Sequence, residues 1–348
     1  MSTGGLSLAL SGTPHRFNGL DTIGAVVFLF DVALFIIICA GISTRFIRVP
    51  GSLLRSLRHP TEALFFPTFW LSISTLMGCM QRYGVPSTGS WLVVAVRVLF
   101  WIYAASTFLI ACFQYWYLFT AKQLTIQSMT PAWILPIFPA MLCGSQPPVH
   151  RLPIIVAGVT FQGLGMTVSF LMYSIYIHRL MEMGLPSPNL RPGMFIAVGP
   201  PAFTALALIG MVDALPENYG YFATYPLAVH ALRPMALFIG IFLWALALWF
   251  FSIALISVLA GVREMSFHLV WWAFVFPNVG FTIATISIGE QLGSEGVLWI
   301  GSAMTILLVC AWLFVFTHHV KAVLARRIMM PGMDEDKDEY EEDDDHQA

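Results

Sequence analysis

Long apolar segments dominate the sequence and restrict its fold more than any other feature. Nine of them hold roughly 20 mostly apolar residues, the length that an α-helix needs to cross the hydrocarbon core of a bilayer. A shorter apolar stretch, Met1 to Ser11, precedes them. With 58% hydrophobic and only 10% charged residues, the chain does not have the composition of a soluble domain. We therefore predict an all-α polytopic membrane protein with spans at 22–44, 62–82, 90–118, 131–147, 152–178, 193–212, 233–260, 268–288 and 297–317.

Arginine and lysine residues predict the orientation of these segments. If Met1 to Ser11 is counted as the first of ten helices, twelve basic residues lie on one side of the membrane and four on the other. The side with more basic residues is normally the cytoplasmic one, so both termini are expected there. Residues 331–348 are strongly acidic and are predicted to be a disordered cytoplasmic tail that follows a transmembrane domain at 1–330.

Proline interrupts every second segment near its middle. Each proline lacks an N–H and frees a carbonyl one turn earlier, which is tolerated in a membrane only where protein or a water-filled cavity meets the freed groups. Successive breaks are 69, 64 and 77 residues apart, and the first segment carries Gly4 and Gly5 instead. We predict five helical hairpins in a ring, with the odd helices lining a central pore. The interrupting residues are Pro67, Pro136, Pro139, Pro200, Pro201 and Pro277.

A phenylalanine accompanies each of these breaks, namely Phe66, Phe138, Phe203 and Phe276. Rings that point into a narrow pore can close it by blocking or by dewetting. The alternative interpretation is that these rings face lipid, since the chain has 28 phenylalanines. The sequence leaves both interpretations open.

Polar residues near the breaks and at the outer helix ends are candidates for contacts with an anion. Thr68 and Asn278 flank two breaks, although such side chains also commonly join helices to one another. Arg82 and Arg233 lie at the outer ends of two predicted helices, where they would attract an anion. Arg82 could also hold a carboxylate bidentately. The alternative for both arginines is contact with lipid headgroups.

Two charges lie deep within even-numbered segments. Asp31 and Arg97 are at similar distances from the outer ends of their segments. An unpaired charge at that depth is costly. We therefore predict that they form an ion pair, with a structural rather than a substrate-binding role.

The chain contains no motif typical of an enzyme. It has no H-E-x-x-H, G-x-S-x-G or P-loop sequence, and its five cysteines form no C-x-x-C pair. We predict that it is not an enzyme and that it has no cofactor and no metal site. No basic domain is present, so a nucleic-acid partner is not expected.

Several motifs resemble those of the tellurite-resistance/dicarboxylate transporter family, which includes fungal malic acid permeases, fungal sulfite efflux pumps and plant slow anion channels. They are most similar to the malic acid permeases. The motifs are MSTGGLSLALSG, HPTEALFFPTF, TPAWILPIFPAMLCG, LPSPNLRPGMFIAVGPPAFTALALIG and WWAFVFPNVGFTIAT.

The resemblance implies ten helices with quasi-fivefold symmetry, and a phenylalanine plug at the position of Phe276. It implies a plasma-membrane, homo-oligomeric carrier of four-carbon dicarboxylates such as malate and succinate. Sulfite efflux and a small-anion channel are the alternatives with the same fold, and a membrane sensor or scaffold is a third. Family members begin before the Gly4-Gly5 run, so the first helix is expected to be truncated here.

Overall fold

The computed structural model describes residues 1–121, 124–141, 151–217, 220–225 and 227–328. Within these ranges every regular element is a helix and there is no strand. Eight segments are long and apolar enough to cross a membrane: Leu20–Arg48, Glu62–Ser87, Ser90–Thr120, Leu152–Met183, Pro188–Asp213, Leu227–Glu264, Leu269–Leu292 and Glu295–Leu324. Each coincides with a predicted span.

The two remaining predicted segments are shorter. Met1 to Ser11 forms α1 (Ser2–Gly12), which is buried along nearly its whole length. The predicted span at 131–147 is represented by a 3₁₀ turn, Pro131–Ile134, and by α7 (Phe138–Met141), and its remainder lies outside the described residues. The predicted tail at 331–348 also lies outside them.

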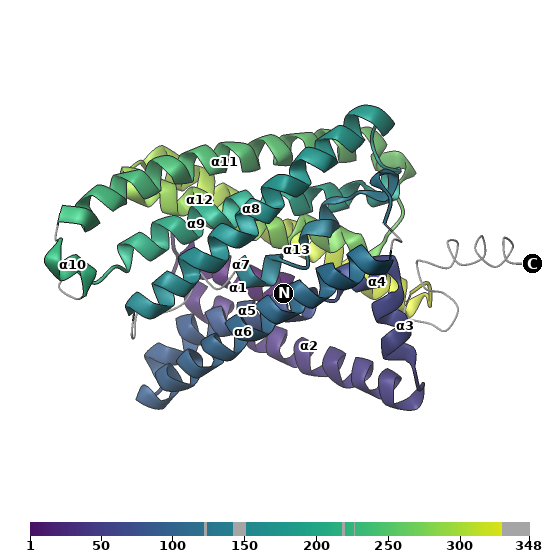
Figure 1. Cartoon of the computed structure of the whole chain (residues 1–348), viewed down its shortest axis with the longest axis horizontal. Coiled ribbons are helices and arrows are strands. Elements are labelled where there is room, and N and C mark those ends of the chain that lie inside the picture. The colour runs from purple at the N-terminus through teal and green to yellow at the C-terminus, as the bar shows by residue number, and fades with distance from the viewer. Residues whose placement is uncertain (122–123, 142–150, 218–219, 226, 329–348) are drawn as a thin grey trace, which may run out of the picture.

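Four uninterrupted helices form the outer part of the molecule: α2 (Leu20–Arg48), α6 (Ser90–Ala121), α8 (Arg151–Met183) and α11 (Leu227–Gly261), together with α13 (Glu295–Leu324) at the C-terminal end. Figure 1 shows α11 along the upper edge and α2 along the lower edge, with α1 and α7 between them. Only 11% of an 18-residue apolar stretch within Leu20–Arg48 is buried by protein. The rest of this apolar surface is suited to contact with lipid.

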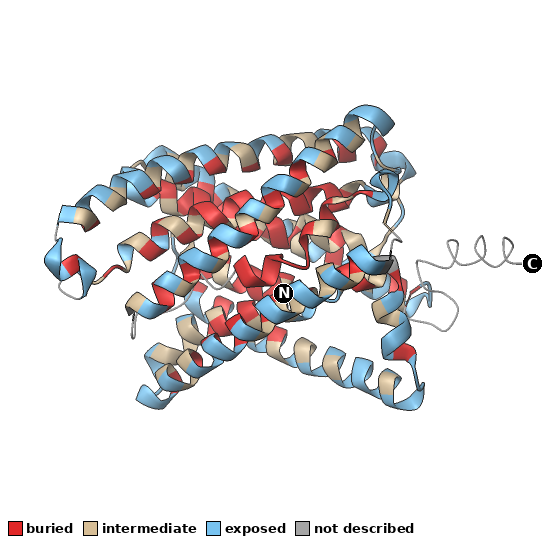
Figure 2. Cartoon of the chain, viewed as in Figure 1, coloured by how far each residue is buried: buried red, intermediate tan, exposed pale blue. Residues whose placement is uncertain are grey.

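Three further helices lie inside and begin at or beside the breaks. They are α5 (Thr68–Cys79), α9 (Gly199–Asp213) and α12 (Phe276–Leu292). The segment that contains α9 has 78% of its 18-residue apolar stretch buried, and the segment that contains α12 has 67% buried. Both helices lie in the interior that is coloured red in Figure 2. Contacts join α1 to α5, α5 to α7, α7 to α9, α9 to α12 and α12 back to α1.

The break in the first of these segments joins two α-helices, α4 (Pro60–Phe65) and α5, whereas the other two segments change their helical type at the break. A 3₁₀ stretch, Pro188–Val198, precedes α9, and another, Leu269–Phe274, precedes α12. Pro200 and Pro277 occupy the first turns of α9 and α12, where the missing N–H costs nothing.

Side chains from the outer helices satisfy the carbonyls that the prolines free. The carbonyl of Ala63, four residues before Pro67, accepts a hydrogen bond from Gln114 of α6. The carbonyl of Ala197, four residues before Pro201, accepts one from Tyr173 of α8 at 2.8 Å. In the third broken segment, Tyr115 of α6 donates to the carbonyl of Trp133 at 2.8 Å. Outer helices thus supply the donors that make the inner breaks tolerable in lipid.

The predicted ion pair between Asp31 and Arg97 is wrong. In the described part of the chain the ionic partner of Asp31 is the terminal ammonium of Met1, 3.7 Å away, because α1 packs along α2.

Candidate functional site

The inner helices enclose a cavity of about 770 Å³. It extends from exposed charged residues at one end, Arg16, Arg82 and Glu290, to the buried ring of Phe276 at the other. The wall of α12 follows one helical face, because Phe276, Val279, Ile283 and Glu290 are spaced by three, four and seven residues. Other lining residues are Gly5, Leu8 and Ser11 of α1, Ser74, Thr75 and Gly78 of α5, and Phe203, Leu206 and Gly210 of α9.

Three phenylalanines from three inner helices meet at the buried end of this cavity. The ring centroids of Phe203 and Phe276 are 5.4 Å apart, those of Phe138 and Phe203 are 5.7 Å apart, and those of Phe138 and Phe276 are 6.1 Å apart. These are contact distances for aromatic pairs. We call Phe138, Phe203 and Phe276 the phenylalanine layer. Among the described residues, the ring of Phe66, which is 38% exposed, contacts none of these three rings.

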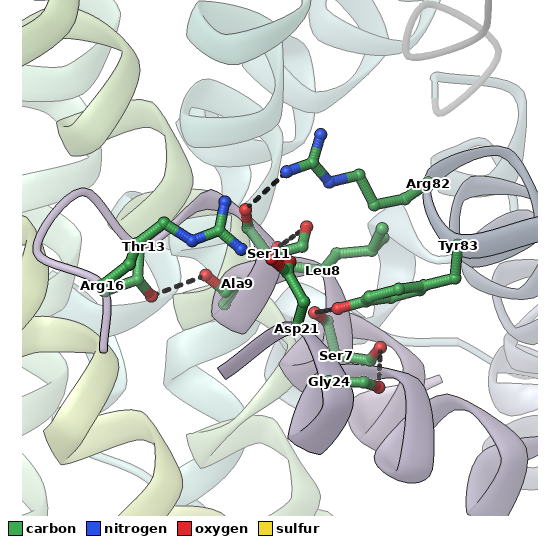
Figure 3. A network of polar contacts seen from close by, with 10 residues as sticks. All are labelled: Ser7, Leu8, Ala9, Ser11, Thr13, Arg16, Asp21, Gly24, Arg82 and Tyr83. Carbon is green, nitrogen blue, oxygen red and sulfur yellow. Dashed lines mark hydrogen bonds and ion pairs between the residues drawn. The ribbon is translucent and has the colours of Figure 1, made fainter. Parts of the chain in front are cut away.

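Arg82 belongs to a π-helical turn, Met80–Gly84, that continues α5. Its Nη2 atom donates to the carbonyl of Ser11 at 3.0 Å, and the neighbouring Tyr83 hydroxyl donates to the carbonyl of Ser7 at 2.8 Å (Figure 3). These two bonds hold the turn against the end of α1. In the part of the chain that the structure describes, Arg82 forms no ion pair, so its charge is balanced by no carboxylate.

The second arginine at the cavity, Arg16, is neutralised. It forms an ion pair with Asp21, as Figure 3 shows. Glu290 of α12 also lines the cavity and lies near Asp213 of α9, whose carboxylate accepts a hydrogen bond from Gln291 at 2.6 Å. The exposed end of the cavity therefore has both an acidic group, Glu290, and a cation without an ion-pair partner among the described residues, Arg82.

Hydroxyl groups line the cavity between Arg82 and the phenylalanine layer. Thr75 donates its hydroxyl to the carbonyl of Ser72 at 2.9 Å, as helical threonines commonly do. Ser74 is 4% exposed and lines the cavity, and no hydrogen bond of its hydroxyl is found among the described residues. The Ser74 hydroxyl is thus a donor available to an anion.

Thr68 and Asn278 have a different role from the predicted one. The Thr68 hydroxyl donates to the carbonyl of Phe65 at 2.7 Å, and the Asn278 amide donates to the carbonyl of Phe274 at 2.9 Å. Both acceptors lie just before a break, so these side chains satisfy backbone groups there. Neither residue is in the cavity wall.

The remaining predicted residues are divided between the cavity and other sites. Gly5 lines the cavity, whereas a side chain at Gly4 would meet Asp31 and Thr75. Arg233 is outside the cavity wall and forms an ion pair with Glu217 at 2.9 Å. Neither Ser74 nor Glu290 was assigned to the site from the sequence, although the helical spacing from Phe276 could have placed Glu290 on the same face.

Comparison with known proteins gives the family of the chain. The SLAC1 family, described as voltage-dependent anion channel, matches residues 1–320. The chain belongs to this voltage-dependent anion channel family. The expected family resemblance is therefore confirmed, and the chain is a multi-pass membrane protein that transports anions and is not an enzyme.

Relatives within the voltage-dependent anion channel family carry two kinds of name. The malic acid transport protein of Schizosaccharomyces pombe is 37% identical over 97% of this chain and 79% of its own length. A putative malic acid transport protein of the same organism is 33% identical over 97% of this chain and 81% of its own length. The sulfite efflux pump of Trichophyton rubrum is 27% identical over 91% of this chain and 86% of its own length.

Proposed function

We propose that this protein carries four-carbon dicarboxylates, chiefly malate and succinate, across the plasma membrane. The observation that carries the proposal is the position of Arg82, an arginine without an ion-pair partner among the described residues, in the wall of a 770 Å³ cavity. A volume of this size is in the range of small-molecule sites. The relatives named as malic acid transport proteins support this choice of cargo.

The charged groups suggest how the substrate is held. One carboxylate accepts hydrogen bonds from the guanidinium of Arg82, whose planar fork matches a carboxylate. The Ser74 hydroxyl replaces part of the lost hydration deeper in the cavity. The second carboxylate stays towards the wide end, since the buried end at Phe276 is apolar.

The path continues through the phenylalanine layer. The contacts that run from α1 through α5, α7, α9 and α12 back to α1 support a ring of five inner helices around it, with the uninterrupted helices outside. Rings in contact leave no passage for a hydrated anion, so Phe276 and its two neighbours close the path and must move for transport. One such path per subunit of a homo-oligomer, with the C-terminus in the cytoplasm, completes the proposal.

Uptake of malate into liposomes tests this function. Purified full-length protein is reconstituted, and radiolabelled malate influx is measured with succinate, sulfite and chloride as competitors. We expect saturable malate influx that succinate inhibits. Sulfite flux without malate flux would instead assign the chain to the activity named for its Trichophyton relative. A large chloride or nitrate conductance independent of dicarboxylate would identify it as a small-anion channel.

A further inference from the structure

Each ring of the phenylalanine layer packs on a glycine of the next inner helix. A Cβ atom added at Gly199 of α9 would lie 2.7 Å from the ring of Phe138, which belongs to α7. One added at Gly280 of α12 would lie 2.7 Å from the ring of Phe203, which belongs to α9. One added at Gly5 of α1 would lie 2.9 Å from Val279 and 3.5 Å from Phe276, both of α12.

A side chain of α1 packs on a glycine of α5 in the same way. A Cβ atom added at Gly78 of α5 would lie 3.2 Å from Leu8 of α1. At four consecutive junctions, a side chain of one inner helix therefore contacts a glycine of the helix that follows it around the circuit. We call Gly199, Gly280, Gly5 and Gly78 the glycine seats. Their backbone angles are ordinary for a helix, so backbone conformation does not explain why glycine is present.

We propose that the three glycine seats beside the phenylalanine layer, Gly199, Gly280 and Gly5, are positioning residues that set how far the layer projects into the anion path. The inference rests on the proposed function, because it treats the layer as the gate. Carbon atoms in contact prefer a separation of about 3.5–4.0 Å. A methyl group 2.7 Å from the Phe203 ring therefore forces the ring to move.

The surroundings of Phe203 give the direction of that movement. The ring contacts Phe138 and Phe276 within the layer, it rests on Gly280, and it lines the cavity. The cavity that the ring lines is free volume into which it can move. An alanine at position 280 consequently displaces the ring towards the path and narrows it.

Gly163 provides a matched control. It is a glycine of α8 that lies outside the cavity wall, and a Cβ atom added there would meet no atom within 4 Å. Gly163→Ala therefore adds the same methyl group to a membrane helix without touching the layer or the cavity wall.

The test is malate influx per mole of reconstituted full-length protein. We expect Gly280→Ala to lower influx about fivefold or more, which corresponds to roughly 1 kcal/mol in the barrier. Gly163→Ala should leave influx within about twofold of wild type. In a Phe203→Ala background the Gly280→Ala change should have no effect, because no ring remains to be displaced. A loss of influx that persists without the ring, or an unchanged influx in Gly280→Ala, would overturn the inference.

A second measurement does not depend on the cargo. The ¹⁹F resonance of 4-fluorophenylalanine incorporated at position 203 should shift in Gly280→Ala and stay in place in Gly163→Ala. If wild-type protein moves no malate, the proposed function fails while this shift still reports on the seat. If Gly280→Ala does not fold, Gly199→Ala with the label at Phe138 makes the same test, and an unmoved resonance in a folded variant refutes the seat.

Discussion

The two halves of the inner helices differ in how they use space. On the Arg82 side of the phenylalanine layer the helices enclose the cavity, and its wall includes Ser74, Gly210 and Glu290. On the other side, the 3₁₀ stretch 194–198 before α9 is buried throughout, and it contacts the corresponding stretch before α12. One half is hollow and the other is packed, with the layer at the boundary between them.

Under the proposed function, this difference indicates what closes the path. The exposed end of the cavity would give an anion access to Arg82 from one side, and transport to the other side would require movement of both the layer and the packed stretches behind it. The hollow half should therefore govern substrate affinity, and the layer should govern rate. Substitutions that separate affinity from rate can break or sharpen this comparison.

The largest effect is expected from the hollow half. Arg82→Gln removes the cation that we propose holds a carboxylate, and hydrogen bonds to charged groups are worth about 1.5–3 kcal/mol. The KM for malate should rise about 10- to 100-fold, with the maximal rate little changed. Arg233→Gln, outside the cavity wall, is the control and should leave KM unaltered. Equal effects of the two substitutions would remove Arg82 from the site.

Opening the layer should act on rate instead. Phe276→Ala removes a ring that contacts both Phe138 and Phe203. We expect maximal influx to rise about tenfold, which corresponds to about 1.4 kcal/mol in the barrier, with little change in KM. Phe66→Ala removes a ring beside a different break and should leave influx near that of wild type. An unchanged rate in Phe276→Ala would mean that the packed stretches alone close the path.

The same contrast explains how much could be predicted from the sequence. The broken segments could be identified from their prolines, because a missing N–H has the same consequence in any membrane helix. These prolines are Pro67, Pro136, Pro200 and Pro277. The phenylalanines beside Pro139, Pro201 and Pro277 do meet, and Arg82 does line the cavity.

Partners across helices could not be predicted in the same way. Thr68 and Asn278 satisfy backbone carbonyls beside the breaks, and Asp31 meets α1 rather than Arg97. Two residues at equal depth in the membrane need not lie on neighbouring helices. Spacing within one helix is the more reliable signal, and it would have connected Glu290 to Phe276.

A moderate effect on stability is expected where an outer helix supports the packed half. Tyr173→Phe removes the hydroxyl that donates to the carbonyl of Ala197, a residue in the packed stretch before α9. Hydrogen bonds between membrane helices are worth about 0.6 kcal/mol and up to about 1.7. The unfolding free energy in detergent should fall by that amount. Tyr117→Phe, which removes a hydroxyl from α6 instead, is the control. An equal loss of unfolding free energy in that variant would show that the bond from Tyr173 to Ala197 does not stabilise the packed half.

The smallest effect is expected at the mouth of the hollow half. Glu290 is exposed at the cavity edge, near Asp213, and its negative charge opposes the approach of an anion. Glu290→Gln should therefore lower the KM for malate about twofold in low salt, as expected for an exposed, screened charge. Because the Debye length falls from about 30 Å at 0.01 M salt to about 8 Å at 0.15 M, the difference should shrink as salt is added. Glu264→Gln, in the turn Val262–Glu264 that follows α11, alters the same net charge away from the cavity wall and should leave KM unchanged at every salt concentration. A salt-independent decrease in KM for Glu290→Gln would show that this carboxylate contacts the substrate directly instead of acting through its field.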